Sequence, residues 1–270
     1  MNDVKPPQMP PLRDLGLDLL RVSRGQRLLT LAYPFLWSAG YFGCAYFEIW
    51  AGAVGCAIAL SFITYGSTSH DLVHRNLGLA RPINDWLLCI IELLAIRSGH
   101  AYQAAHLHHH ARFPHTDDIE ALASRYSFLG AIAEGFVFQF RIVRWALRNA
   151  KAQRIWIVGE TLVCLLWLVA AVLTFPYTLI IAAHVALMVM GSWIIPLITS
   201  YLPHDPHGAS ELSQTRAFRG TVASVLAVEH LYHLEHHLFP AVPHTNWRTL
   251  AQRLDPHFRE AGVKPVVFWF

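Results

Sequence analysis

The sequence predicts an all-α integral membrane protein with four transmembrane helices in two hairpins and a histidine-rich helical cap on the cytoplasmic side. Three observations lead to this prediction. Of the 270 residues, 54% are hydrophobic and 14% are charged, which is too apolar for an ordinary soluble domain. Four apolar stretches are long enough, or nearly so, to cross a bilayer. Three histidine clusters follow these stretches at positions that could meet on one side of the membrane.

The first predicted hairpin follows a polar, proline-bearing N-terminal segment, residues 1–27. Leu28–Phe47 is almost entirely apolar, and Glu48 marks a turn. Ile49–Tyr65 then runs back as a slightly short span, rich in Gly and Ala residues that allow close helix packing. The hairpin therefore delivers the first histidine cluster to the side on which the chain began.

The central segment is predicted to stay at the membrane surface. Trp86–Ile96 is apolar but short, and it carries Glu92, so we expect a re-entrant or interfacial helix that returns to its starting side. A tilted span is the alternative for this stretch. Phe128–Ala150 mixes apolar residues with three arginines, which is typical of a helix that lies on the membrane with basic side chains toward the headgroups.

Ile155–Phe175 and Tyr177–Ile198 are predicted to form the second hairpin, with its turn at Pro176. After this point the sequence has no stretch long and apolar enough to cross again. The expected organisation is one domain over residues 1–270. It consists of a cytoplasmic segment (1–27), the spans with the central cytoplasmic segment (28–200) and a cytoplasmic cap (201–270).

The distribution of positive charge indicates the orientation. In the four-span topology all 21 Lys and Arg residues fall on the histidine side, and the loops near Glu48 and Pro176 carry none. Positive residues mark the cytoplasmic face, so the termini and all histidine clusters are expected there. The formal net charge is only +3, and anionic lipids account for the basic residues without nucleic acid as a partner.

The spacing of the histidines predicts a metal site. Residues three and four apart share one face of a helix, so the imidazoles of each cluster should converge. A structural zinc takes four ligands, whereas the clusters offer eight imidazoles and a ninth at the end of the last span, which indicates two metal ions. Imidazole does not by itself select the element. The candidate ligands in the clusters are His70, His74, His106, His109, His110, His233, His236 and His237, and His204 could make a ninth.

Other polar residues are given supporting roles. His108 lies about 200° around a helix from His106 and should point away from the metal, and His230 is expected to support His233 rather than bind metal. His184 falls within a span and should face the interior of the helix bundle. Ordinary surface or loop positions are predicted for His100, His115, His207, His244 and His257. Acceptors for ligand N–H groups are predicted at Asp71, Asp117, Asp118 and Glu235, with helix capping or surface charge as an equally ordinary role for Asp117 and Asp118.

Together the motifs His70-x3-His74, His106-x2-His109-His110 and His233-x2-His236-His237 resemble the three histidine boxes of the membrane fatty acid desaturase and hydroxylase superfamily. The similarity extends from about residue 28 to residue 247 and includes the two hydrophobic hairpins. The resemblance implies that the eight box histidines hold a non-haem di-iron centre. It also implies O2 as co-substrate, externally supplied electrons and the removal of hydrogen from an unactivated C–H bond of a lipid.

The expected electron donor is a separate protein of the ferredoxin or cytochrome type. The chain has no dinucleotide fingerprint or Gly-rich phosphate loop, so we expect it to bind no nicotinamide or flavin of its own.

Fatty acyl desaturation is the favoured reaction, because the general desaturase pattern is what the boxes match most directly. Tyr201-Leu-Pro-His204 also looks like the carotenoid ring hydroxylases and ketolases, which are the alternative. A histidine-rich membrane metal transporter is a more distant alternative. Transport favours ionisable ligands near the bilayer midplane, whereas these clusters lie at the ends of the spans.

Overall fold

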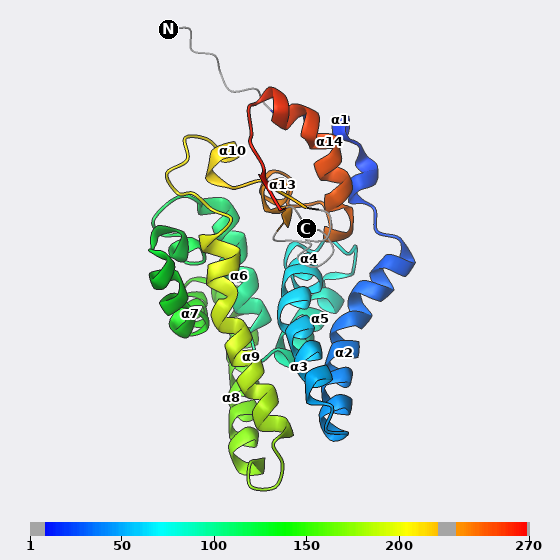
Figure 1. The fold of residues 1–270 in the computed structure, drawn as a ribbon, viewed down its shortest axis with the longest axis vertical. Helices are drawn as coiled ribbons and strands as arrows, with labels where there is room; N and C mark the ends of the chain where they lie inside the picture. The colour runs from blue at the N-terminus through cyan, green and yellow to red at the C-terminus, as the bar shows by residue number, and fades with distance from the viewer. Residues whose placement is uncertain (1–8, 221–230, 269–270) are drawn as a thin grey trace.

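The computed structural model describes residues 9–220 and 231–268, and these parts of the chain are mainly helical (Figure 1). The helices are α1 (Leu12–Leu15), α2 (Arg24–Tyr46), α3 (Trp50–Ile58), α4 (His70–His74), α5 (Arg81–Leu94), α6 (Gly99–Arg112), α7 (Phe128–Asn149), α8 (Arg154–Thr174), α9 (Ile180–Pro196), α10 (Glu211–Gln214), α13 (His233–Leu238) and α14 (Trp247–Glu260). Two strands, β1 (Phe218–Arg219) and β2 (Val266–Val267), pair in parallel. In Figure 1 the pairs α2–α3 and α8–α9 extend toward one end, and α13 and α14 cover the other.

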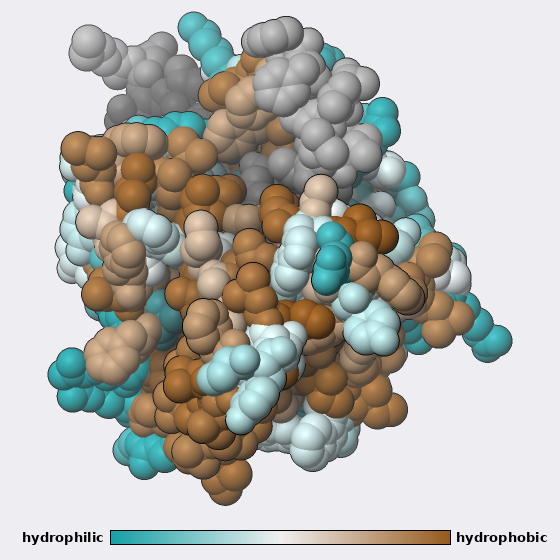
Figure 2. All heavy atoms as spheres, turned by 60° about the horizontal axis from the view of Figure 1, so that its bottom comes forward, coloured by the Kyte–Doolittle hydropathy of each residue, from teal (hydrophilic) through white to brown (hydrophobic). Residues whose placement is uncertain are grey.

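Among the described residues, three helical segments are long and apolar enough to cross a membrane: Trp50–His74, Lys151–Thr174 and Ile180–Tyr201. Figure 2 shows that apolar side chains cover much of the lower face of the molecule. The chain is therefore a membrane protein. α2 has 23 residues but begins with Arg24, Gln26 and Arg27, so it is less apolar than these three segments, and its predicted crossing stays a prediction.

The first helical pair begins at a capped N-terminus. Ser23 Oγ accepts a hydrogen bond from the Gln26 backbone N–H, and the Gln26 side chain accepts one from the Ser23 N–H, which is a capping box. Glu48 adopts a left-handed conformation (φ 59°) in the turn to α3. The turn therefore lies where the sequence predicts it.

The helix that follows this turn is longer than predicted. Instead of ending near Tyr65, it continues from α3 through the π-helical turns Ala59–Ile63 and Tyr65–Ser69 into α4. The polar run before α4 stays helical because its hydroxyls have partners, for example Thr68 Oγ1, which donates to the Thr30 carbonyl. The first two candidate ligands therefore lie on the last turn of a long, rigid helix.

The short helix α5 returns the chain toward the site. Its 14 residues have a length of about 21 Å, which is shorter than a hydrocarbon core of about 30 Å, so α5 does not span. Glu92 near its end is buried. It accepts hydrogen bonds from Ser69 Oγ (2.5 Å) and Arg97 Nε (2.7 Å), which tie α5 to the long helix and to the loop before α6.

α9 lies very close to the long helix that contains α3 and α4. At Gly191 a Cβ atom would collide with the side chain of Ser61, so only glycine permits this approach. Farther along α9, Trp193 Nε1 donates to the Ile132 carbonyl of α7 (2.7 Å). These contacts fix the end of α9, where another π-helical turn, Leu197–Tyr201, leads to His204.

The C-terminal helices pack on the N-terminal segment. Leu19, Trp247 and Leu250 belong to one buried hydrophobic cluster, and Arg253 Nη2 pairs with Asp18 Oδ2 at 2.7 Å. The segment before α2 is thus part of the same layer as α14. The β1–β2 pair also lies in the C-terminal region, and the all-α prediction did not include it.

Candidate metal centre

The nine histidines predicted as ligands lie together in two adjacent groups. The first group is His70, His74, His106, His110 and His236. The second group is His109, His204, His233 and His237. Within each group, the nitrogen atoms that could bind a metal all lie within 4.8 Å of one another.

Helical periodicity produces this division. In α6 the histidines at positions 106 and 110 are one turn apart and enter the first group, while His109 lies to one side and enters the second. In α13 His236 and His237 are likewise directed to different groups, because neighbouring residues are about 100° apart around a helix. Each of these two helices therefore supplies both groups.

Four Nε2 atoms of the first group form a closed ring of short distances. The His70–His106, His106–His110 and His236–His70 distances are each 3.1 Å, and the His110–His236 distance is 2.7 Å. Ligand nitrogens about 2.1 Å from a metal and at right angles to each other are about 3.0 Å apart. The ring therefore has the dimensions of four adjacent ligands around one ion, with His74 as the fifth member of the group.

The second group has similar spacing. The Nε2 atoms of His204, His233 and His237 form a triangle with sides of 3.1, 3.2 and 3.1 Å. His109 Nε2 lies 3.2 Å from His237 Nε2. The second group thus has the spacing of a four-nitrogen site.

Hydrogen bonds at the opposite ring nitrogens orient several of these imidazoles. His106 Nδ1 donates to the Glu120 carboxylate (3.1 Å), His109 Nδ1 donates to Asp118 (2.7 Å), and His204 Nδ1 donates to the Ser200 carbonyl (3.0 Å). A neutral imidazole that donates from Nδ1 carries a lone pair on Nε2. Lone pairs that converge at 3 Å repel unless a cation lies between them, so the residues fit a pair of metal ions.

The electrostatics of the centre favour neutral imidazoles. Burial, reinforced by neighbouring histidines, holds the pKa of His110, His236 and His237 well below its usual range. Burial also lowers the pKa of His109, but the Asp118 carboxylate outweighs it and leaves that pKa raised. Since a histidine must be unprotonated to bind a metal, most of the centre is already in the ligating form near neutral pH.

Four carboxylates were predicted to accept hydrogen bonds from the N–H groups of candidate ligands, and Asp118 does so from His109. The prediction was wrong for Asp71 and Glu235, whereas Asp117 takes the surface-charge role that was its alternative. Asp71 accepts from His244 (2.6 Å), Asp117 pairs with Arg112 at the surface, and Glu235 pairs with Arg219 (2.6 Å). Glu120, which the sequence analysis missed as an acceptor, holds His106 instead. Its only sequence signal is an acidic residue ten positions after the second histidine box.

Several other histidines can also be compared with their predictions. His108 lies outside both groups, as predicted, and its ring packs against Trp145. His184 is buried in the bundle, where its Nε2 donates to the Leu94 carbonyl, also as predicted. His230 lies outside the described residues.

Two histidines for which ordinary surface or loop positions were predicted are bound to buried carboxylates. His100 is 1% exposed, and its Nδ1 donates to Glu160 (2.6 Å). His244 donates to Asp71, which lies between the two histidines of α4, and so joins the C-terminal region to that helix. Trp247, another residue that the sequence did not single out, packs against the rings of His70 and His236 with centroid distances of 5.3 and 5.1 Å.

Replacing Asp118 with asparagine is expected to weaken metal binding about 10- to 100-fold, because the amide leaves His109 without its charged acceptor. The matched control is Asp117→Asn, one residue away, which changes only a surface ion pair with Arg112. Metal titration of the purified variants measures the effect. Equal affinities in the two variants would contradict the orienting role of Asp118.

Comparison with known proteins gives one result that bears on identity. The family model described as "Fatty acid desaturase" matches residues 48–269. Comparison with curated proteins found no match. The matched region covers most of the chain and contains all nine histidines of the two groups. By its sequence and its histidine clusters, the chain belongs to the fatty acid desaturase family.

Proposed function

We propose that this protein is an O2-dependent di-iron oxidoreductase that desaturates fatty acyl chains in the membrane. The observation that carries the proposal is the pair of histidine groups, whose nine imidazoles have the spacing of two neighbouring metal sites. Family membership supports an oxidoreductase that acts on lipid. Zinc would fit this chemistry poorly because it is redox-inert.

When bound, two iron ions would supply the reduction of O2 and an oxidant able to attack an unactivated C–H bond. All nine histidines would hold them, five in the first group and four in the second. Asp118, Glu120 and the Ser200 carbonyl keep three imidazoles in the tautomer that binds metal. Trp247 covers the first group from the side of the C-terminal helices, where it excludes water from the centre.

Two partners follow from this reaction. The substrate is a long lipid chain that reaches the centre from the bilayer. The electrons come from a separate ferredoxin- or cytochrome-type protein, because the sequence carries no nicotinamide, flavin or haem motif of its own.

We further propose that α2 also crosses the membrane, which gives four spans in two hairpins with the histidine side in the cytoplasm. α2 pairs with α3 through a short turn at Glu48, much as α8 pairs with α9. The absence of Lys and Arg from the loops around Glu48 and Pro176 supports this orientation.

Cysteine labelling tests this topology. In a background without the four natural cysteines, Tyr177→Cys, which is 89% exposed in the turn after α8, should react with an impermeant reagent added outside intact cells. His207→Cys, exposed near α10, should react only after the membrane is opened. Labelling of His207→Cys in intact cells would overturn the cytoplasmic assignment of the centre.

Oxidation of a carotenoid ring is the second candidate. The motif Tyr201-Leu-Pro-His204 resembles that of carotenoid hydroxylases and ketolases, and His204 belongs to the second histidine group. Both reactions need the same centre and differ in the lipid that is positioned beside it.

Expression in a host that makes both lipids distinguishes the two reactions. Wild type and His236→Ala should be compared by mass spectrometry of acyl chains and carotenoids. New double bonds in acyl chains, absent from the His236→Ala sample, are the expected result. Oxygenated carotenoid rings with unchanged acyl chains would overturn acyl desaturation in favour of the second candidate.

A further inference from the structure

A small cavity lies between the two histidine groups. Its volume is ≈ 20 Å³, about enough for one water molecule. Histidines of both groups line it, together with Glu120 and four other residues that face the same space: Tyr65, Tyr102, Thr199 and Trp247. A carbon atom of a substrate that enters this cavity therefore lies against these four side chains.

Trp247 belongs to the C-terminal helices, whereas the other three come from the membrane side of the centre. Tyr65 and Thr199 lie on the two candidate spans Trp50–His74 and Ile180–Tyr201, and Tyr102 lies on α6. A lipid chain that approaches from the bilayer meets these three residues before it meets the C-terminal helices. We call them the membrane-side wall.

The backbone is irregular where the two spans contribute to this wall. Tyr65 lies in the π-helical turn Tyr65–Ser69, and Thr199 lies in the π-helical turn Leu197–Tyr201. Such turns are rare, and they occur frequently at functional sites because the extra residue changes the direction of a side chain. The irregular backbone is an observation separate from the cavity. It indicates that the side chains of Tyr65 and Thr199 are directed toward a functional site.

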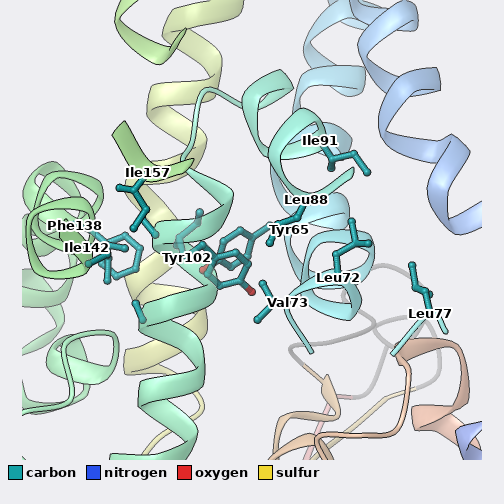
Figure 3. Packing of buried hydrophobic residues seen from close by; sticks show 14 residues of the cluster. Tyr65, Leu72, Val73, Leu77, Leu88, Ile91, Tyr102, Phe138, Ile142 and Ile157 are labelled. Carbon is teal, nitrogen blue, oxygen red and sulfur yellow. The ribbon is translucent and has the colours of Figure 1, made fainter. Parts of the chain in front are cut away.

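The tyrosines of the wall are held rigidly. Their rings stack with centroids 4.4 Å apart and an interplanar angle of 21°, and Figure 3 shows them between the apolar side chains of two helical layers. The Arg97 guanidinium lies 4.8 Å from the centroid of the Tyr65 ring, and Glu92 in turn holds Arg97. The wall cannot yield to a substrate without the loss of these contacts.

We propose that Tyr65, Tyr102 and Thr199 determine which carbon of the lipid chain is oxidised, by limiting how far the chain advances from the bilayer toward the metal centre. This inference rests on the proposed function. A rigid wall beside a cavity of one-atom size discriminates between registers of the chain that differ by one methylene. Such a difference in a hydrophobic site changes reaction ratios about 10- to 200-fold.

The test compares the positions of new double bonds in products of wild type, Tyr65→Ala and Thr199→Ala. Removal of either side chain should let the chain advance farther and change the ratio of positional isomers by at least about tenfold. Tyr65→Phe keeps the ring and should keep the wild-type ratio. Tyr177→Ala removes a tyrosine that is 89% exposed and far from the wall in the sequence, so it is the matched control.

A second readout does not depend on turnover. Purified holoprotein, kept free of O2 and reductant, is titrated with saturated fatty acids of increasing length that displace a fluorescent fatty acid. Both alanine variants should prefer longer chains than wild type and Tyr177→Ala do.

Unchanged isomer ratios together with an unchanged length preference would overturn the wall inference. If an alanine variant gives no product, its preference for fatty acid chain length alone tests the wall inference. Failure of wild type to oxidise any lipid would instead refute the proposed function, so the two failures are distinguishable.

Discussion

Alanine at His109 or His236 is expected to abolish turnover and to release iron, with activity reduced by more than about a hundredfold. Each substitution removes one imidazole from a different histidine group. Among the described residues, the neighbouring candidate histidines already belong to one of the two groups, so a replacement imidazole would have to leave its own position. Iron content and O2 uptake of the purified variants measure the loss.

His108→Ala is the matched control for this experiment. His108 lies beside His109 on α6, but its ring packs on Trp145 and its Nε2 donates to the Asp117 carbonyl. The variant should keep its iron and most of its activity. Loss of iron in His108→Ala with retention in His109→Ala would reverse the assignment of the two faces of α6.

The second prediction with a large expected effect concerns the buried ion pair between Arg97 and Glu92. Both side chains are at most 1% exposed. Arg97→Leu leaves the Glu92 carboxylate buried without its cation and should lower the free energy of unfolding by about 3 to 5 kcal/mol. The loss should appear in thermal unfolding of the purified protein in detergent.

Two further variants test whether the loss of stability in Arg97→Leu comes from the unpaired buried charge of Glu92. Arg112→Leu breaks an exposed pair with Asp117, in which the side chains are 44% and 52% exposed, and should cost about 0 to 1 kcal/mol. The double variant Arg97→Leu/Glu92→Leu removes both charges and should recover much of the stability. If Arg97→Leu unfolded like wild type, the ion pair would have no part in joining α5 to the loop before α6.

The sequence predicts the candidate site well because helical periodicity is local. Spacings of three and four residues are sufficient to place the imidazoles of each box on one helix, and in the structure all nine candidates meet in two groups. His204 could be chosen because of its position just after the last apolar span. The separation of His109 from His106 and His110 into different groups needs the relative positions of the helices, which periodicity does not provide.

What the sequence could not predict depends on distant parts of the chain. The run Gly66–Ser69 has the composition of a helix end, but the hydroxyls of Thr68 and Ser69 bond to Thr30 and Glu92 from other helices, so the helix continues to the candidate metal centre. Asp71 and His244 are separated by 173 positions, and their contact forms only when the C-terminal region packs on α4. For the same reason His100, which binds Glu160, could not be distinguished from a surface histidine.

The metal content of the purified protein tests the central proposal most directly. After reconstitution with ferrous iron without O2, wild type should bind two irons per chain. His109→Ala, which affects the second histidine group, should bind fewer irons than His108→Ala. Two irons in wild type, with reductant-dependent O2 uptake, is the result that the proposal predicts. One metal per chain, or stoichiometric zinc without O2 uptake, would contradict it.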